Sequence, residues 1–421
     1  MPQQKRRRKL TDKERREKER GFTALKGLAE SKSEGKMDEI KEKDKKYIMG
    51  TYGRYDLHIV SGKGALCRDE QGKSYIDLGS GIGVNSLGWC DEGWIKAVEA
   101  QLEKLQHSSN LYFTSPGALL AEALSARTGC KKVFFCNSGA EANEAAIKTA
   151  RKYSFDKYGA GRHNVITLKK SFHGRTMATL TATAQESMHD FFFPFNAGFI
   201  YCEKDMDEIK AQKNVCAVML EFIQGEGGVI PLEEEFVKEL FKWCEQNDIL
   251  FIADEVQTGV GRTGTFLCSE QYGIKPDITT LAKGLGGGLP IGAMLAGEKC
   301  EKTLGAGAHG STFGGNPVVC AGANYVLSRL DEDMLKEVRR KGAALKASLE
   351  GIKGVKSVSG KGLMLGLELE EKKAADVVKE CIARGVIPLT AKDRVRLLPP
   401  LVITNEQLEK AVSVLKEVIE G

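Results

Sequence analysis

The stretch Thr279-Thr-Leu-Ala-Lys283-Gly-Leu-Gly-Gly-Gly288 places one lysine between a short apolar run and a glycine-rich loop. Upstream, Asp254 ends another apolar run, Ile249-Leu-Phe-Ile-Ala253. Short apolar runs of this kind, bounded by turn residues, are typical of buried strands. The chain therefore presents a lysine and a carboxylate at the ends of two predicted strands, which is where α/β sheets bind their ligands.

Helical patterns alternate with such runs from about residue 90 onward. Apolar residues recur at helical spacing at Phe236, Val237, Leu240, Phe241 and Cys244, and the run 249–253 follows at once. The runs 165–168 and 215–220 are also short and apolar. This alternation predicts an α/β fold whose mostly parallel sheet is covered by helices on both faces.

Four parts of the chain are predicted. Residues 1–46 form a polar, basic arm that we expect to be disordered, because it has too little apolar surface to bury. Residues 47–86 begin a small domain with short strands, and residues 87–317 form the large domain. Residues 318–421, with helical patterns near 331–350, 373–384 and 405–420, complete the smaller α+β domain.

Composition is that of a globular enzyme: 421 residues, 42% hydrophobic and 28% charged. No apolar run approaches the ~20 residues of a membrane helix, and no secretory signal is recognisable, so we expect a cytoplasmic protein without membrane contact. The 11 cysteines contain no C-x-x-C pair, and the six histidines lack the spacing of metal ligands. Reduced thiols and no metal site are the expectation.

The positive charge is concentrated in the arm. Residues 1–20 hold 10 basic and 4 acidic side chains, whereas the rest of the chain holds 52 basic and 53 acidic ones. We expect a solvated tail rather than a nucleic-acid contact. A nucleic-acid-binding protein with a vestigial enzyme body is the non-enzymatic alternative, and salt-dependent DNA binding would reveal it.

A lysine and a carboxylate at strand ends are what a protein needs to bind pyridoxal phosphate (PLP). The lysine amine condenses with the aldehyde, and the carboxylate keeps the pyridine nitrogen protonated so that the ring withdraws electrons. Asn137-Ser138-Gly139-Ala140 lies between a predicted strand and a predicted helix. Free N–H groups at such a helix start can hold a phosphate, although an ordinary capped helix has the same pattern.

Further motifs follow in order. Phe172 and Arg175, in Ser171-Phe-His-Gly-Arg-Thr176, offer a ring that can stack on a flat cofactor and a guanidinium that can bind a carboxylate. Carboxylates, glycine turns, hydroxyls and a second arginine occur in the segments 221–228, 254–259, 261–264, 310–317 and 396–401. Each motif by itself is modest evidence for a PLP site, whereas their joint occurrence in this order is strong evidence.

Together these motifs resemble those of the subgroup III aminotransferases of the fold-type I PLP enzymes, and most closely the acetylornithine branch. The resemblance covers roughly residues 47–421. It rests on Asn137-Ser-Gly-Ala-Glu-Ala-Asn-Glu144, Phe172-His-Gly-Arg-Thr176, Gln224-Gly-Glu-Gly-Gly228, Asp254-Glu-Val-Gln-Thr-Gly259, Leu281-Ala-Lys-Gly284 and Ser311-Thr-Phe-Gly-Gly-Asn-Pro317.

The resemblance implies roles for these residues. Lys283 would hold PLP and act as the catalytic proton shuttle, and Asp254 would pair with the pyridinium nitrogen. The remaining cofactor-binding residues would be Ser138, Gly139, Ala140, Phe172, Val256, Gln257 and Thr312. Thr312, with Ser311, would reach the cofactor of a neighbouring subunit, which implies a homodimer with shared active sites.

The implied reaction transfers an amino group from N2-acetyl-L-ornithine to 2-oxoglutarate, a step of arginine biosynthesis that yields N-acetylglutamate 5-semialdehyde and glutamate. Arg175 would bind the donor's α-carboxylate while Glu226 neutralises Arg396. 2-Oxoglutarate would then occupy both arginines, with Glu226 displaced. Arg396 argues for an external oxo acid and against a PLP mutase or racemase.

The donor is less tightly specified than the reaction. Gly81 stands where the ornithine branch tends to have a tyrosine, which leaves room for an acylated amine. Succinylornithine, ornithine, 4-aminobutyrate and N-acetyl-lysine remain alternatives, because pockets separate related acyl groups by only ~1–3 kcal/mol. Two residues depart from the pattern: Trp89 replaces a usual histidine, and Phe222 a usual proline.

Overall fold

The computed structural model describes residues 36–421. Among them, residues 36–60 and 68–73 form one compact unit, and residues 61–67 and 74–421 form another. This division into compact units does not test the boundaries that the sequence predicts after residues 46, 86 and 317. Those boundaries remain proposals.

The first unit contains helix α2 (Lys36–Tyr47), which covers the end of the predicted arm. Residues 1–35 lie outside the described residues, so the expected disorder and solvation of the arm stay predictions. The N-terminal basic cluster, Lys5 to Lys9, falls within that undescribed part.

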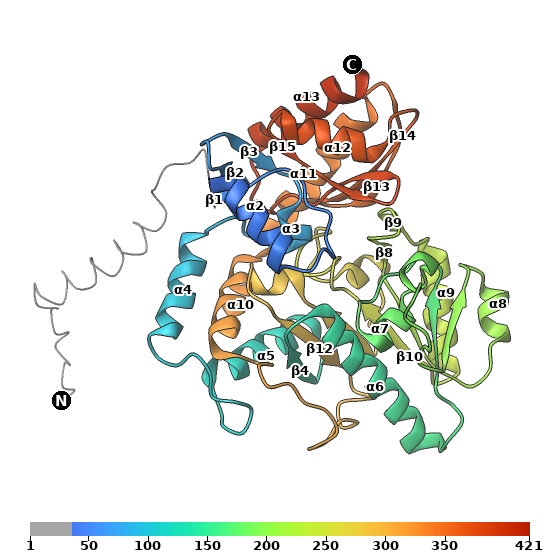
Figure 1. Ribbon diagram of the computed structural model, residues 1–421. Helices are drawn as coiled ribbons and strands as arrows, with labels where there is room; N and C mark the ends of the chain where they lie inside the picture. The colour runs from blue at the N-terminus through green and yellow to red at the C-terminus, as the bar shows by residue number, and fades with distance from the viewer. Residues whose placement is uncertain (1–35) are drawn as a thin grey trace, which may run out of the picture. The chain divides into compact units, whose positions relative to one another are not determined.

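A seven-stranded sheet is the centre of the second unit (Figure 1). Its strands, in spatial order, are β4 (Lys132–Cys136), β12 (Gly292–Ala296), β11 (Ile278–Leu281), β10 (Leu250–Asp254), β7 (Val215–Leu220), β5 (Asn164–Leu168) and β6 (Phe199–Cys202). Strand β12 runs antiparallel to both of its neighbours, and the pairs from β11 to β6 are parallel. The predicted α/β class with a mostly parallel sheet is confirmed.

Alternate residues of β10 pack into two different cores. Leu250 and Ile252 pack with the apolar side of helix α6 (Gly139–Tyr158), which is rich in alanine. Phe251 and Ala253 pack instead in the core that includes helix α9 (Glu234–Gln246). Both faces of the strand are therefore covered, which explains why its sequence is apolar without alternation.

A second, antiparallel sheet has the order β13 (Val355–Lys361), β14 (Met364–Leu369), β17 (Arg394–Leu397) and β16 (Leu389–Ala391). Helices α11 (Glu332–Glu350), α12 (Ala374–Ala383) and α13 (Asn405–Glu420) accompany it (Figure 1). These helices agree closely with the three helical patterns expected near 331–350, 373–384 and 405–420. The smaller α+β part of the predicted fold is thus present.

The remaining elements are short or connect these layers. They are β1 (Ile59–Lys63), β2 (Leu66–Asp69), β3 (Ser74–Asp77), α3 (Ser80–Gly83), α4 (Glu92–Leu102), α5 (Ser115–Thr128), α7 (Met177–Ala182), η1 (Glu186–Met188), α8 (Met206–Ala211), β8 (Ile223–Gln224), β9 (Ile230–Pro231), η2 (Cys268–Tyr272), η3 (Lys283–Gly286), α10 (Pro317–Arg329) and β15 (Val386–Ile387). Strand β15 pairs in parallel with β3. None of the helices within the described residues has the length and apolar character needed to cross a membrane.

The two sequence departures have structural partners. The indole Nε1 of Trp89 donates a hydrogen bond to Asp77 Oδ2 at 2.8 Å. Phe222 is fully buried and stacks on Tyr272 with 4.8 Å between ring centroids. Tyr272 Oη also donates to the carbonyl oxygen of Phe222 at 3.3 Å. Phe222 therefore belongs to the core, and its side chain does not form the edge of a cleft.

The cysteines form no disulfide, and all of them except Cys90 are buried. Within residues 36–421, no group of three or more histidine, cysteine, aspartate and glutamate side chains is placed to hold a metal ion.

Candidate active site

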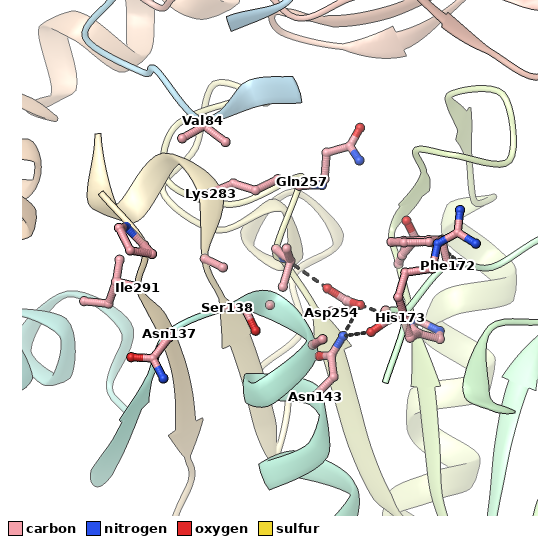
Figure 2. A pocket seen from close by; sticks show the side chains of 18 of the residues that line it. Val84, Asn137, Ser138, Asn143, Phe172, His173, Asp254, Gln257, Lys283 and Ile291 are labelled. Carbon is pink, nitrogen blue, oxygen red and sulfur yellow. Dashed lines mark hydrogen bonds and ion pairs between the residues drawn. The ribbon is translucent and has the colours of Figure 1, made fainter. Parts of the chain in front are cut away.

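A cavity of about 440 Å³ lies where β4, β5, β7, β10 and β11 end (Figure 2). Its volume is in the range of small-molecule sites, ~300–1,000 Å³. Nine of its lining residues are among those expected from the sequence: Ser138, Gly139, Ala140, Phe172, Arg175, Asp254, Val256, Gln257 and Lys283. The motifs therefore meet in one cavity, although they are spread over about 150 residues of the chain.

Lys283 follows β11 and begins the short helix η3. Its φ of 43° is unusual for a residue with a side chain, and such strain is common at functional sites. No hydrogen bond or ion pair holds its amine among the described residues. Burial lowers the pKa of Lys283, the charge of Glu226 opposes that shift, and the charge of Arg396 adds to it. The amine is thus half-buried, unpartnered and easier to deprotonate than a surface lysine.

The carboxylate of Asp254 is fixed by three donors. Its Oδ2 accepts from Asn143 Nδ2 at 2.8 Å and lies 2.7 Å from His173 Nδ1, while its Oδ1 accepts from the Val256 N–H at 3.1 Å. Because an ionised carboxylate only accepts, His173 carries its proton on Nδ1. Figure 2 shows these contacts at the base of the cavity. The carboxylate is buried and oriented, as a partner for a ring nitrogen must be.

Helix α6 begins at the cavity, and Ser138 is its N-cap. The Ser138 hydroxyl accepts from the Glu141 N–H at 3.2 Å. The first N–H groups of a helix have no partner within the helix, so those of Gly139 and Ala140 are available to an anion. A Cβ at Gly139 would stand 2.6 Å from Val256 Cγ1, so only glycine allows this approach of helix and loop.

These residues fit PLP. An unpartnered lysine amine, a fixed carboxylate and a helix start are the donors and acceptors that its aldehyde, ring nitrogen and phosphate require. The half-buried ring of Phe172 and the side chain of Val256 line the same cavity and offer apolar surface to a flat ring.

Arg396, Glu226 and Gln257 form a cluster next to the cavity. Arg396 is 3% exposed, and its Nη1 donates to Glu226 Oε1 at 2.5 Å and to Gln257 Oε1 at 3.3 Å. Burial raises the pKa of Glu226, but the charge and hydrogen bond of Arg396, together with smaller effects of Lys283 and Gln257, lower it overall. The buried Nε of Arg396 has no partner in the described residues. Gln257 lines the cavity, whereas Arg396 and Glu226 lie one contact behind it.

Arg175 is exposed, with its guanidinium carbon 5.7 Å from the centre of the Phe172 ring. It lines the cavity and can bind an anionic ligand there. The structure therefore provides one exposed and one neutralised arginine.

Ser311 and Thr312 are not brought into the cavity of their own chain. The hydroxyl of Ser311 accepts from Asn137 Nδ2 at 3.0 Å, beside the cavity. Thr312 is exposed. Its expected contact with a cofactor therefore depends on a second subunit.

Residues that surround Asp254 and the 172–175 loop were not assigned a role from the sequence. Asn143 is 1% exposed, receives a hydrogen bond from Thr280 Oγ1 at 2.7 Å and donates to the carbonyl oxygen of His173. Its place on the alanine-rich side of α6 is the signal that could have identified it. Glu221 also lines the cavity and ends a predicted strand, but no partner for it was evident from the sequence.

The model of the class-III aminotransferase family matches residues 49–419. The acetylornithine aminotransferase of Haemophilus ducreyi is 53% identical over 91% of this chain and 98% of its own length. That of Caldanaerobacter subterraneus subsp. tengcongensis is 46% identical over 89% of this chain and 98% of its own length.

Solved structures give the same picture. N-acetylornithine aminotransferase from Stenotrophomonas maltophilia has a TM-score of 0.78 at 35% identity, over 90% of this chain and 98% of that one. Ornithine aminotransferase from Toxoplasma gondii, described with partial occupancy of PLP, has a TM-score of 0.87 at 30% identity, over 94% and 97%. Backbone similarity and sequence identity thus rank these two relatives differently.

Proposed function

This chain belongs to the class-III aminotransferases, and we propose that it transfers the amino group of N2-acetyl-L-ornithine to 2-oxoglutarate in the cytoplasm, for arginine biosynthesis. The products would be N-acetylglutamate 5-semialdehyde and glutamate. The observation that carries this proposal is the unpartnered Lys283 amine in one cavity with the fixed carboxylate of Asp254.

PLP, when bound, supplies an aldehyde for amines and a ring that withdraws electrons from the reacting carbon. Asp254 holds a proton on the ring nitrogen, and His173 and Asn143 keep the carboxylate oriented toward the cavity. The N–H groups of Gly139 and Ala140, with Ser138, bind the phosphate. Lys283, whose lowered pKa favours the neutral amine, takes and returns the proton at the carbon that bears the reacting amine.

Two arginines would select the two substrates. The exposed Arg175 binds the α-carboxylate of the donor, while Glu226 keeps Arg396 neutralised. The two carboxylates of 2-oxoglutarate require both arginines, so Glu226 must leave Arg396. This exchange of one charge-assisted pair for another lets a single site accept two unlike substrates in turn.

The choice of donor rests on the named relatives and on the space around Gly81. A Cβ built at Gly81 would have its nearest neighbour, Asn85 Nδ2, at 3.8 Å. Its φ of 61° strains any other residue there. The same turn supplies Val84, which lines the cavity. A side chain at residue 81 would lie in ordinary van der Waals contact with Asn85 and Val84, and the glycine leaves that volume free for the acyl group of the donor.

A homodimer with shared active sites completes the proposal. Asn110 Nδ2 donates to the carbonyl oxygens of Ser311 and Gly314, so the loops around residues 110 and 312 lie together. They present Leu111, Tyr112, Phe113 and Phe313 with exposed fractions of 86%, 71%, 109% and 60%. Large apolar side chains gathered on a surface are typical of a protein contact. A second copy placed there would bring Thr312, with Ser311, to its neighbour's phosphate site.

The test is glutamate formation by the PLP-loaded protein from 2-oxoglutarate and five donors: N-acetylornithine, succinylornithine, ornithine, 4-aminobutyrate and N-acetyl-lysine. We expect the highest kcat/KM for N-acetylornithine, with succinylornithine and N-acetyl-lysine within ~10–200-fold. A higher kcat/KM for free ornithine or 4-aminobutyrate would contradict the donor assignment and leave the aminotransferase reaction intact.

A further inference from the structure

Glu221 is a buried carboxylate, 5% exposed, whose two oxygens accept hydrogen bonds from different parts of the chain. Oε2 accepts from the N–H of Phe172 at 2.9 Å, and Oε1 accepts from the N–H of Gly225 at 3.1 Å. Both donors are backbone groups. Glu221 therefore joins two loops, which we name the arginine loop (residues 169–175) and the glutamate loop (residues 224–228).

The two loops touch at further points. Gln224 Nε2 donates to the carbonyl oxygen of Lys169 at 2.9 Å. A Cβ at Gly227 would stand 2.7 Å from the carbonyl oxygen of Lys170, so only glycine permits that approach. Gly225 is also the base of a turn, because its carbonyl oxygen accepts from the N–H groups of Gly228 and Val229 at 3.3 and 3.2 Å. Glu221 thus holds the residue from which the glutamate loop turns.

Each loop carries one side of the carboxylate-recognition machinery. The arginine loop carries Arg175, together with Phe172, whose ring lies 5.7 Å from the guanidinium carbon. The glutamate loop carries Glu226, which follows Gly225 directly and pairs with Arg396 at 2.5 Å. A shift of either loop would move Arg175 relative to Glu226, the carboxylate that pairs with Arg396.

The electrostatic surroundings fit a residue that orders its neighbours. Burial and the negative charge of Asp254 raise the pKa of Glu221 to about 7, although the electrostatic interaction with His173 lowers it. No cationic side chain bonds directly to Glu221 among the described residues; the two N–H groups are its partners. Both of its oxygens thus accept hydrogen bonds from backbone N–H groups.

We propose that Glu221 is a positioning residue that sets the spacing between the Arg175 and Glu226 sides of the site, and with it the affinity for dicarboxylic substrates. The inference rests on the proposed function, because it assigns a specificity role within that reaction. Glu221 sets this spacing because its one carboxylate accepts hydrogen bonds from both the Phe172 and the Gly225 N–H groups.

The test uses the PLP-loaded full chain and three variants. Glu221→Gln leaves one of the two N–H groups without an acceptor, and Glu221→Asp keeps the charge but is too short to reach both. Glu255→Gln is the matched control: Glu255 is also fully buried and accepts backbone N–H groups, from Cys268 and Ser269, but contacts neither loop. Amide hydrogen exchange of the loops is measured in each protein, together with calorimetric binding of glutarate, an unreactive dicarboxylate.

We expect faster exchange at the Phe172 and Gly225 amides in both Glu221 variants, and wild-type exchange there in Glu255→Gln. Glutarate should bind the Glu221 variants about tenfold more weakly, which corresponds to ~1.4 kcal/mol. KM for 2-oxoglutarate should rise in parallel, with kcat less affected, because Lys283 and Asp254 are untouched.

Unchanged exchange at both amides, or unchanged glutarate binding in both Glu221 variants, would overturn the proposal. Equal loosening of the loops in Glu255→Gln would also overturn it, because the effect would then be general destabilisation. Failure of the proposed function is a separate result: wild-type protein would make no glutamate from N-acetylornithine and 2-oxoglutarate, whereas the exchange data need no turnover.

Discussion

Two carboxylates of the site, Asp254 and Glu226, are held in opposite ways. Asp254 ends a central strand and accepts hydrogen bonds from three donors on helix α6, the 173 loop and its own turn. Glu226 lies in a loop and is bound chiefly by one guanidinium group. Moving Asp254 would leave several buried donors unsatisfied, whereas moving Glu226 breaks one ion pair that a substrate carboxylate can replace. The difference separates fixed chemistry from adjustable recognition.

The chemistry that depends on the fixed Asp254 also requires Lys283, and Lys283→Ala should abolish it most completely. Without the amine, the proton at the reacting carbon has no carrier, and we expect turnover to fall at least ~10⁴-fold. PLP can still bind through its phosphate and ring contacts. The measurement is glutamate formation by rigorously purified protein, with Lys238→Ala, on the exposed face of α9, as the control. Wild-type turnover in Lys283→Ala would refute the assignment.

Asp254→Asn removes the charge of the fixed carboxylate with almost no change of side-chain volume. The amide cannot keep a ring nitrogen protonated. In either orientation its NH₂ group faces a hydrogen-bond donor, either the Val256 N–H or the donors of His173 and Asn143. We expect kcat to fall ~10²–10⁴-fold and stability to fall by ~1–3 kcal/mol. Asp277→Asn lies away from the cavity and removes the negative charge that pairs with Lys299 at 3.0 Å, so it serves as the control for stability alone. Equal kcat values for the two variants would contradict the role of Asp254.

Glu226→Gln tests the adjustable side. An amide no longer neutralises Arg396, so the guanidinium becomes available to 2-oxoglutarate without competition. We expect the ratio of the dissociation constants for N-acetylornithine and 2-oxoglutarate to shift about tenfold toward 2-oxoglutarate, or ~1.4 kcal/mol. Pre-steady-state measurement of the two half-reactions gives this ratio. A ratio equal to that of the wild type would exclude the switch.

The last expected effect concerns stability and not activity, and it arises from Glu255, a buried carboxyl outside the cavity. Burial raises the pKa of Glu255 from its ordinary value of 4.5 to about 7. The folded protein then binds more protons than the unfolded chain between about pH 4.5 and 7, so Glu255 makes stability fall as pH rises through that window. The fall is at most roughly 3 kcal/mol. Denaturant unfolding at pH 5 and 8 should show a weaker decline in Glu255→Gln, and an identical decline would contradict the raised pKa.

The sequence predicts the strand ends better than it predicts what surrounds them. Lys283 and Asp254 could be found because apolar runs precede them, and parallel strands bring their ends to one edge. Asn143 and His173 could not be assigned, since their contacts with Asp254 depend on how α6 and a distant loop dock on the sheet. Local patterns contain no information about that docking.

Glu221 and the two departures illustrate the same limit. Glu221 was recognisable as a carboxylate after a strand, but its partners, the Phe172 and Gly225 N–H groups, are defined only by the folded loops. Trp89 and Phe222 were visible only as unusual residues at their positions. Their partners, Asp77 and Tyr272, come from segments that the sequence does not connect with them. The roles of the site residues remain predictions until variants test them.

The most direct test of the central claim is the absorbance spectrum of the purified, PLP-loaded protein during addition of N-acetylornithine without an oxo acid. The account predicts that the visible band of the lysine-bound cofactor converts to the band of the pyridoxamine form, and that 2-oxoglutarate restores it. A visible band that does not respond to N-acetylornithine would contradict the donor assignment. Absence of any such band after PLP is added would contradict the assignment of Lys283 and Asp254 as a cofactor site.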